Sequence, residues 1–139
     1  AKYVAVLNIP DMSTTPAANA QSPEIRGLIL NMVIWFNDVL AYELKDVAGV
    51  TMVDVFTVSR KQIADPASAG LTNVTGTACN LTMPSPNPLG SSLVCNASNL
   101  NDGDVSHYLF SDTVHPSPYG YQLLADLVTT NLRQAGWLL

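Results

Sequence analysis

One segment near the end of the sequence, DTVHPSPYG from Asp112 to Gly120, has the residue types and spacing that suit proton transfer. An Asp three residues before a His allows a short turn to bring the carboxylate to the imidazole ring. The carboxylate can accept the proton of one ring nitrogen and fix the tautomer, which leaves the other nitrogen free to act as a base. The segment is therefore a candidate for acid–base chemistry, and a purely structural Asp–His turn is the alternative.

The residues around this segment predict the elements that hold it. Tyr108-Leu109-Phe110 is an apolar, aromatic run that leads into Asp112. After His115, Pro116 restricts the chain, and Ser117-Pro118 predicts the start of a helix, with the Ser as its cap. One face of that helix is apolar, and Gly136 ends it; the apolar residues are Leu123, Leu124, Leu127, Val128 and Leu132.

The first 64 residues predict a parallel βαβ unit. Lys2 to Asn8 (KYVAVLN) and Val50 to Val55 (VTMVDV) are β-rich runs typical of buried strands. Between them, Ser22-Pro23-Glu24 begins a long helix with apolar residues at helical spacing, which we expect to run from Pro23 to Val47. Residues 11–21 are predicted as a loop, and Phe56 to Ala64 as a short helix. Strand, helix and strand in this order favour an α/β fold with a parallel sheet.

The stretch 66–107 is predicted to be a long, mostly uncharged loop excursion. From Pro66 to Asn101, 36 consecutive residues include no Asp, Glu, Lys or Arg. Cys79 and Cys95 lie within it, 16 positions apart, and a disulfide that closes this loop would contribute about 3 kcal/mol through the unfolded chain. Two unpaired thiols are the alternative. We expect no metal site, because no second Cys pair or His cluster accompanies them.

Composition excludes several classes of protein. The 139 residues suffice for one domain, and 47% of them are hydrophobic, which allows a buried core. Six Lys and Arg residues and a net charge of −5 cannot form the basic surface that nucleic-acid binding requires. Because no uninterrupted apolar run reaches about 18 residues, we expect no transmembrane segment. The 33 Asn, Ser and Thr residues and the possible disulfide favour a secreted, periplasmic or cell-surface protein.

For six further residues we favour a structural role over a functional one. Asn37-Asp38 is expected on a solvated helix face, and Asp54 is expected to cap the helix that follows it. His107, with acidic residues nearby, is expected at the rim of a cleft rather than in a metal site. Trp35 and Phe36, on the long helix, are expected in the core.

Two blocks of the sequence resemble GDSL-type esterases and lipases, the SGNH hydrolases. FSDTVHPSPYGYQLLAD resembles the last block of that family, with Phe110, Asp112, His115, Pro116, Ser117, Gly120 and Tyr121 in register. AKYVAVLNIPDMSTTP resembles an earlier strand and loop of the family, through Asn8, Pro10, Asp11, Thr15 and Pro16. Ser13 stands where the family often has Gly. The nearest branch is that of bacterial secreted and autotransporter-type lipases and esterases.

The resemblance implies a fold and a reaction. The fold would be the C-terminal part of a flavodoxin-like, three-layer α/β/α SGNH hydrolase domain that comprises residues 1–139. His115 would be the catalytic base and Asp112 its partner in the hydrolysis of a carboxylic ester, through an acyl-enzyme intermediate and without a cofactor. The uncharged excursion would line an acyl pocket with Leu89, Leu93 and Val94, and the substrate would be a lipid or a short-chain ester.

The same resemblance shows which parts of the family's site are missing. The sequence has no Gly-Asp-Ser-Leu block for the nucleophilic Ser and no Gly-x-Asn-Asp block for the oxyanion hole. We therefore expect an N-terminal, Ser-bearing segment of the same enzyme, present as a second chain after a proteolytic nick, to dock on an open sheet edge. A secreted, non-catalytic binding module is the second hypothesis, and a truncated fragment without activity of its own is the third.

Overall fold

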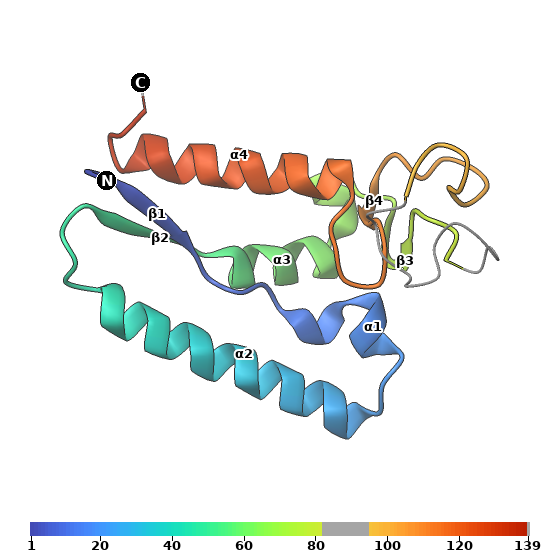
Figure 1. Ribbon diagram of the computed structural model, residues 1–139, viewed down its shortest axis with the longest axis horizontal. Helices are drawn as coiled ribbons and strands as arrows, with labels where there is room; N and C mark the ends of the chain where they lie inside the picture. Colours follow the sequence, from blue (N-terminus) through green and yellow to red (C-terminus); the bar gives the residue numbers. More distant parts are fainter. Residues whose placement is uncertain (82–94, 139) are drawn as a thin grey trace.

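The computed structural model describes residues 1–81 and 95–138, and its parallel strands and connecting helices confirm the predicted α/β class (Figure 1). In chain order the elements are β1 (Val4–Leu7), the 3-10 helix η1 (Met12–Thr14), α1 (Pro16–Asn19), α2 (Pro23–Leu44), β2 (Val50–Val53), α3 (Val55–Ala64), the 3-10 helix η2 (Pro66–Ala69), β3 (Asn73–Thr77), β4 (Tyr108–Phe110) and α4 (Pro118–Gln134).

β1, α2 and β2 form the predicted βαβ unit. The two strands are parallel, with Val4 opposite Val50 and Leu7 opposite Val53. The Ser22 side chain accepts a hydrogen bond from the Ile25 amide and caps α2. Behind the helix, Gly49 turns the chain at φ +76°, where a Cβ would lie 2.6 Å from the Lys2 carbonyl oxygen. Glycine is therefore required at this return into β2.

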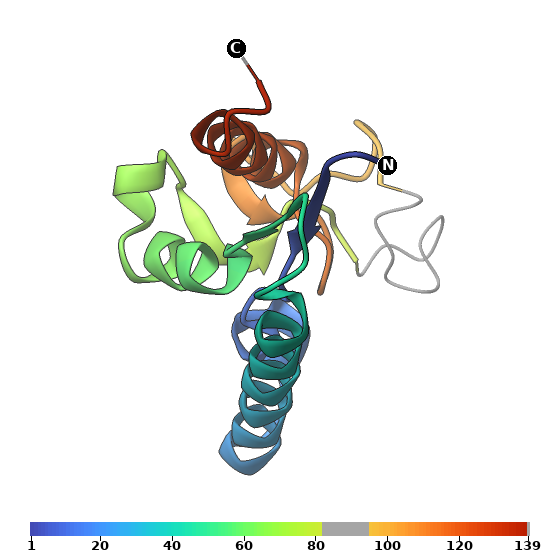
Figure 2. The ribbon, with the colours of Figure 1, turned by 90° about the vertical axis from the view of Figure 1, so that its left-hand side faces the viewer.

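The β1–β2 pair lies between α2 and α4, and both helices contact β2 (Figures 1 and 2). Apolar residues on both sides of a strand pair require such cover, because a parallel pair is normally buried on both faces. The placement of helices on both faces is what the α/β prediction requires. The carboxyl ends of the two strands lead into the loop before α1 and into α3, which both line the cavity described below.

Within the described residues neither outer edge of the β1–β2 pair is paired with a further strand, and the edge at β1 can be followed residue by residue. The amides of Val4 and Asn8 donate to carbonyls of the neighbouring β2 segment. Since successive residues of a strand point their backbone groups to opposite edges, the N–H and C=O groups of Ala5 and Leu7 face away from β2. Val4 and Leu7 are also exposed at 40% and 38%. The expected open sheet edge is thus present at β1.

The excursion 66–107 contains more structure than the sequence predicted. It holds η2 and β3, and β3 pairs in parallel with β4, which lies just before the candidate site. The prediction of a loop was wrong here because the five strand residues, NVTGT, include Asn and Gly, which are rare in strands. Tertiary pairing with β4 overrides that weak local preference.

The predicted disulfide between Cys79 and Cys95 is present, and Cys79 is fully buried. Close to it, Leu71, Leu109 and Phe110 form a small buried cluster with partly buried residues of α3 and α4 around it. The excursion is therefore joined to the α/β unit both by backbone pairing and by apolar packing.

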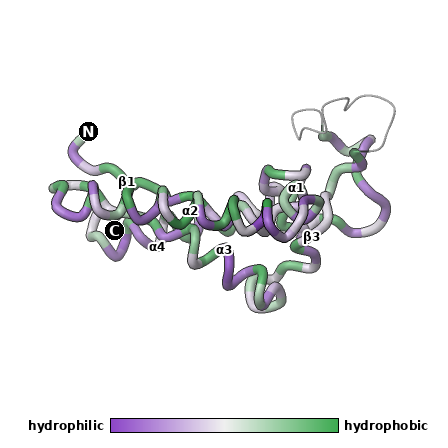
Figure 3. Tube along the Cα trace, turned by 90° about the horizontal axis from the view of Figure 1, so that it is seen from below, coloured by the Kyte–Doolittle hydropathy of each residue, from purple (hydrophilic) through white to green (hydrophobic). Residues whose placement is uncertain are grey.

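α2 is covered on one side only. Val33 and Asn37 are buried, whereas Trp35 and Phe36 are exposed at 70% and 45%, so the prediction that both lie in the core is wrong for the described residues. Apolar residues recur along the whole length of the helix (Figure 3). By length and composition alone, α2 is apolar enough to cross a membrane, and little of it is buried. Its polar residues are spaced so that no long uninterrupted apolar run exists.

Candidate active site

The segment after β4 forms a tight turn in which one carboxylate holds one histidine. Asp112 Oδ2 lies 2.8 Å from His115 Nδ1, and Oδ1 accepts hydrogen bonds from the amides of Val114 at 2.8 Å and His115 at 2.6 Å. The Asp112 side chain is 3% exposed, whereas that of His115 is 54% exposed. The structure thus brings together the two residues singled out in the sequence, with the Nε2 side of the ring accessible.

Backbone hydrogen bonds connect both ends of this turn to β4 and the residue that follows it. The Ser111 amide donates to the His115 carbonyl at 2.8 Å, and the Ser117 amide donates to the Leu109 carbonyl at 2.8 Å. The Ser117 hydroxyl donates to the Tyr108 carbonyl and accepts from the Gly120 amide. Ser117 is therefore the cap of α4, as predicted, and it is not a free nucleophile. The imidazole is carried by a rigid support between a strand and a helix start.

The loop that follows β1 is organised by a second buried carboxylate. Asp11 Oδ1 accepts from the Ser13 amide and hydroxyl, and Oδ2 accepts from Arg60 Nη1 of α3 at 2.7 Å. The Asp11 side chain is 1% exposed. These bonds start η1, and the Thr15 hydroxyl then caps α1. The sequence analysis predicted neither short helix and gave Arg60 no role. A buried carboxylate requires a charged or hydrogen-bonding partner, and Arg60, one of six Lys and Arg residues in the chain, provides it.

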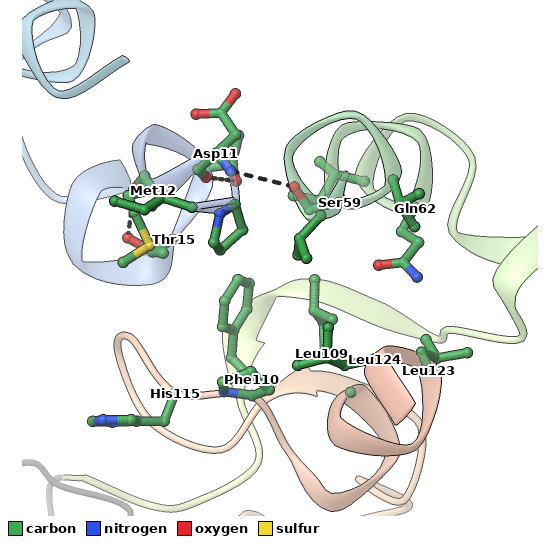
Figure 4. Close-up of a pocket in the computed structure, with 18 of the residues that line it drawn as sticks. Asp11, Met12, Thr15, Ser59, Gln62, Leu109, Phe110, His115, Leu123 and Leu124 are labelled. Carbon is green, nitrogen blue, oxygen red and sulfur yellow. Dashed lines mark hydrogen bonds between the residues drawn. The ribbon is translucent and has the colours of Figure 1, made fainter. Parts of the chain in front are cut away.

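The two sequence blocks meet in space. The Ala17 amide of α1 donates to the Thr113 carbonyl at 2.9 Å, which joins the first loop directly to the Asp112–His115 turn. A cavity of about 420 Å³ lies between this loop, α3 and α4, and most of the side chains that line it are apolar. Met12, Phe110 and Leu124 line it, and His115 lies at its margin with the ring directed away from the apolar residues (Figure 4).

Three hydroxyl groups that line this cavity donate hydrogen bonds to backbone carbonyl groups. Thr14 Oγ1 donates to the Asp11 carbonyl at 2.6 Å, Thr15 Oγ1 to the Met12 carbonyl at 2.9 Å, and Ser59 Oγ to the Phe56 carbonyl at 3.0 Å. Within residues 1–81 and 95–138, no hydroxyl is hydrogen-bonded to the His115 ring. The part of the chain that the structure describes therefore holds the Asp112–His115 pair without a hydroxyl group bound to it.

The carboxyl ends of β1 and β2 are joined by side chains. Asn8 Nδ2 donates to Asp54 Oδ1 at 3.0 Å, and Asp54 Oδ1 also accepts from the Thr57 amide. Burial alone would raise the pKa of Asp54, but the hydrogen bonds from Thr57 and Asn8 and the charge of Lys61 outweigh it and lower the pKa below its usual value. The predicted role of Asp54 as a helix cap is confirmed.

Asn37 was expected on a solvated face of α2, and this prediction is wrong. Its side chain is buried, accepts from the Ile9 amide at 2.9 Å and donates to the Ile9 carbonyl at 2.8 Å. Both backbone groups of Ile9, two residues after the end of β1, are thereby satisfied by a single amide side chain. Asn37 thus holds the chain between β1 and the Asp11 loop.

The remaining predicted residues lie elsewhere. His107 packs edge-on against Tyr119 at 4.3 Å and bonds the Ser106 hydroxyl, and it does not line the cavity. In the described ranges, no group of three or more His, Cys, Asp or Glu side chains is placed to hold a metal ion. Leu89, Leu93 and Val94, which were predicted to line an acyl pocket, lie outside the described residues.

Comparison with known proteins points to ester chemistry. No family model matches the sequence. Over 144 aligned residues, which include 99% of this chain, the sequence is 30% identical to Esterase EstA of Pseudomonas aeruginosa and equally so to Esterase EstA of Pseudomonas putida. The chain is similar to two esterases. It spans about a fifth of the length of these curated relatives (20%), so what the whole relatives do applies here only as a proposal.

Proposed function

We propose that this chain supplies the general base and its orienting acid to a serine esterase or lipase of the SGNH type. His115 takes the proton of a nucleophilic hydroxyl as that hydroxyl attacks the ester carbonyl, and it returns the proton to the leaving alcohol. Asp112 holds the ring in the tautomer with the proton on Nδ1 and stabilises the imidazolium that forms. Water then hydrolyses the acyl-enzyme by the same route.

The observation that carries this proposal is the pairing of a buried carboxylate with an accessible imidazole. Asp112 is almost fully buried and accepts three hydrogen bonds from the turn, whereas more than half of the His115 side chain is exposed. The esterase relatives support the same reaction class.

The nucleophile and the oxyanion-hole donors would come from a segment outside these residues, N-terminal to them in the same enzyme and either continuous with them or present as a second chain. Two observations support this arrangement. The cavity hydroxyls of Thr14, Thr15 and Ser59 are bound to the backbone. The backbone groups of Ala5 and Leu7 in β1 face an unpaired edge in the described part of the chain.

The protein would act outside the cytosol, in the periplasm or at the cell surface of a bacterium, or as a secreted enzyme. The Cys79–Cys95 disulfide is consistent with an oxidising compartment. The substrate class would be carboxylic esters with an acyl group that an apolar site accepts.

The test is covalent labelling of the natural polypeptide with a fluorophosphonate, followed by peptide mass spectrometry. We expect one labelled Ser outside these 139 residues and loss of labelling in the His115→Ala variant. His107→Ala, which removes the other histidine, should label normally. A label on a Ser within this chain, or unchanged labelling and p-nitrophenyl ester hydrolysis in His115→Ala, would exclude the assignment. A folded protein that neither labels nor hydrolyses esters would favour the binding-module hypothesis.

A further inference from the structure

A disulfide-bridged segment is bonded directly to the base of the Asp112–His115 turn. The Cys79 amide donates to the Ser111 carbonyl at 3.0 Å, and the Ala78 amide donates to the Phe110 carbonyl at 2.8 Å. Ser111 immediately precedes the turn in the sequence. Cys79 is fully buried, and Ser111 is 7% exposed. Two buried backbone bonds therefore reach within one residue of the carboxylate that holds the imidazole.

Ser111 connects this segment to the far side of the turn as well. Its amide donates to the His115 carbonyl at 2.8 Å, and its hydroxyl donates to the Pro116 carbonyl at 3.1 Å. Its own carbonyl accepts from the Cys79 amide, so each polar group of Ser111 has a partner. A displacement of the Cys79 backbone would therefore act on the residues both before and after Asp112.

The other side of residues 78–80 is held by residues 99–101. The Asn80 amide donates to the Asn99 carbonyl at 2.7 Å, and the Asn101 amide donates to the Ala78 carbonyl at 2.9 Å. Backbone hydrogen bonds thus run without a break from residues 99–101, through residues 78–80, to the candidate site.

The disulfide joins the two outer segments of this arrangement. Cys95 lies directly before a turn that is closed by the bond from the Asn99 amide to the Asn96 carbonyl at 3.1 Å. Its Cα atom lies 5.9 Å from that of Cys79. We call residues 78–80 and 95–101, with the disulfide between them, the disulfide platform. Without the covalent bond, residues 99–101 would be free to separate from residues 78–80, which support the turn.

We propose that the disulfide platform positions the Asp112–His115 turn for proton transfer, an inference that rests on the proposed function of that turn. Reacting groups must be held within about 0.5 Å of the productive geometry, and a misplacement of about 1 Å lowers the rate by about 10²-fold. Cys79 acts through Ser111 and is thus a positioning residue. The alternative is a disulfide that stabilises the fold as a whole without any specific effect on the turn.

The test compares two destabilised variants of the natural polypeptide. One is the double variant Cys79→Ala, Cys95→Ala. The other is the control Val33→Ala, which truncates a buried residue of α2 and leaves the platform unchanged. Urea midpoints measure the stability of each, and kcat and KM are measured on p-nitrophenyl esters at a temperature at which circular dichroism shows both to be folded.

We expect kcat to fall by about 10- to 10²-fold in the disulfide variant, with KM changed by less than about twofold. In Val33→Ala, kcat should change by less than about twofold. If the double variant does not fold, Asn101→Ala replaces it, because this change removes side-chain bonds to the carbonyls of Thr77 at 2.7 Å and Cys79 at 3.3 Å while the disulfide stays intact. An unchanged kcat in the platform variant, or an equal loss in Val33→Ala, would overturn the proposal.

Hydrogen exchange examines the same turn without an activity assay. The amides of Val114 and His115 are bonded to Asp112 Oδ1. In the platform variant, deuterium uptake by a peptide that contains these amides should become at least about fivefold faster relative to a peptide from α2. No such relative increase should occur in Val33→Ala, and its absence from the platform variant would also overturn the proposal.

The two readouts separate this proposal from the esterase assignment. An active native enzyme whose platform variant keeps both its kcat and its relative exchange refutes the platform alone. A native protein that hydrolyses no ester, but whose platform variant shows faster exchange in the turn, refutes the esterase assignment and supports the structural link between the platform and the turn.

Discussion

The Asp112 carboxylate holds His115 twice, with Oδ1 on the backbone amide at 2.6 Å and Oδ2 on ring Nδ1 at 2.8 Å. Two bonds from one carboxylate fix the position of the His backbone and the orientation of its ring together. The spacing of three residues allows both bonds to form within one turn. A partner far away in the sequence would orient the ring but would not shape the turn that carries it.

His115→Ala is expected to lower ester hydrolysis by at least about 10³-fold in the natural polypeptide, because the variant has no group to take the proton of the nucleophile. The measurement is kcat/KM on p-nitrophenyl esters. His107→Ala is the matched control, since His107 contacts Tyr119 and Ser106 rather than the cavity, and its kcat/KM should change by less than about threefold. A similar loss in both variants would point to a general effect on folding.

Asp112→Asn and Asp112→Ala should separate catalysis from structure. The Asn variant retains an oxygen for the amides of Val114 and His115, so its free energy of unfolding should change little, while kcat falls by about 10²- to 10⁴-fold because the ring tautomer is no longer fixed. The Ala variant leaves those amides without an acceptor and should also lose about 1–3 kcal/mol of stability. Urea unfolding and kcat are measured together; full activity in the Asn variant would contradict the assigned role.

Gly120→Ala and Gly27→Ala should change stability in opposite directions. A Cβ at residue 120 would lie 2.7 Å from the Leu109 carbonyl oxygen and 3.0 Å from Pro116 Cβ, so we expect a loss of about 1–3 kcal/mol. A Cβ at Gly27, inside α2, meets nothing within 4 Å and should stabilise the helix by about 0.5–1 kcal/mol. Denaturant midpoints test both, and an equal effect of the two variants would refute the close contact at α4.

Removal of the Cys79–Cys95 disulfide is expected to cost about 3 kcal/mol, since it releases a closed loop of 16 residues in the unfolded chain. The double variant Cys79→Ser, Cys95→Ser should unfold at lower urea concentration than the oxidised protein. Reduction of the native protein should reproduce most of this decrease, and the reductant should leave the double variant unchanged. Stability that is insensitive to both treatments would show that the excursion is held by β3–β4 pairing alone.

The pKa of Asp54 is lowered in the folded protein, so its ionised form stabilises the fold. The sign follows from linkage. The contribution is fully present above the unfolded pKa of about 3.9 and is lost as the pH falls through the lower, folded pKa. Asp54→Asn keeps a capping oxygen without the charge. The advantage of the native protein over this variant in urea unfolding should therefore be larger at pH 7 than at pH 3, and the reverse order would contradict the assignment.

Local signals in the sequence were sufficient for the elements that depend on neighbouring residues. The Ser-Pro pairs at residues 22–23 and 117–118 predicted two helix starts, and both are observed with the Ser as cap. The same holds for the parallel β1–α2–β2 unit and for the Asp54 cap. The prediction failed at β3 and at Asn37, where partners distant in sequence decide the outcome: β4 for the strand and Ile9 for the buried amide. It also missed α1, although Thr15-Pro16 is a local start signal of the same kind as the Ser-Pro pairs.

The order of residues by itself determined the α/β class, the Asp–His spacing and the position of the cysteines, because each depends on contacts within a few residues or on the periodicity of apolar side chains. Only the tertiary structure decided that the loop after β1 lies against the Asp112–His115 turn, that Arg60 neutralises Asp11, and that α2 has a second, uncovered apolar side. Such facts depend on where distant segments meet, and a linear pattern of residue types carries no direct record of that meeting.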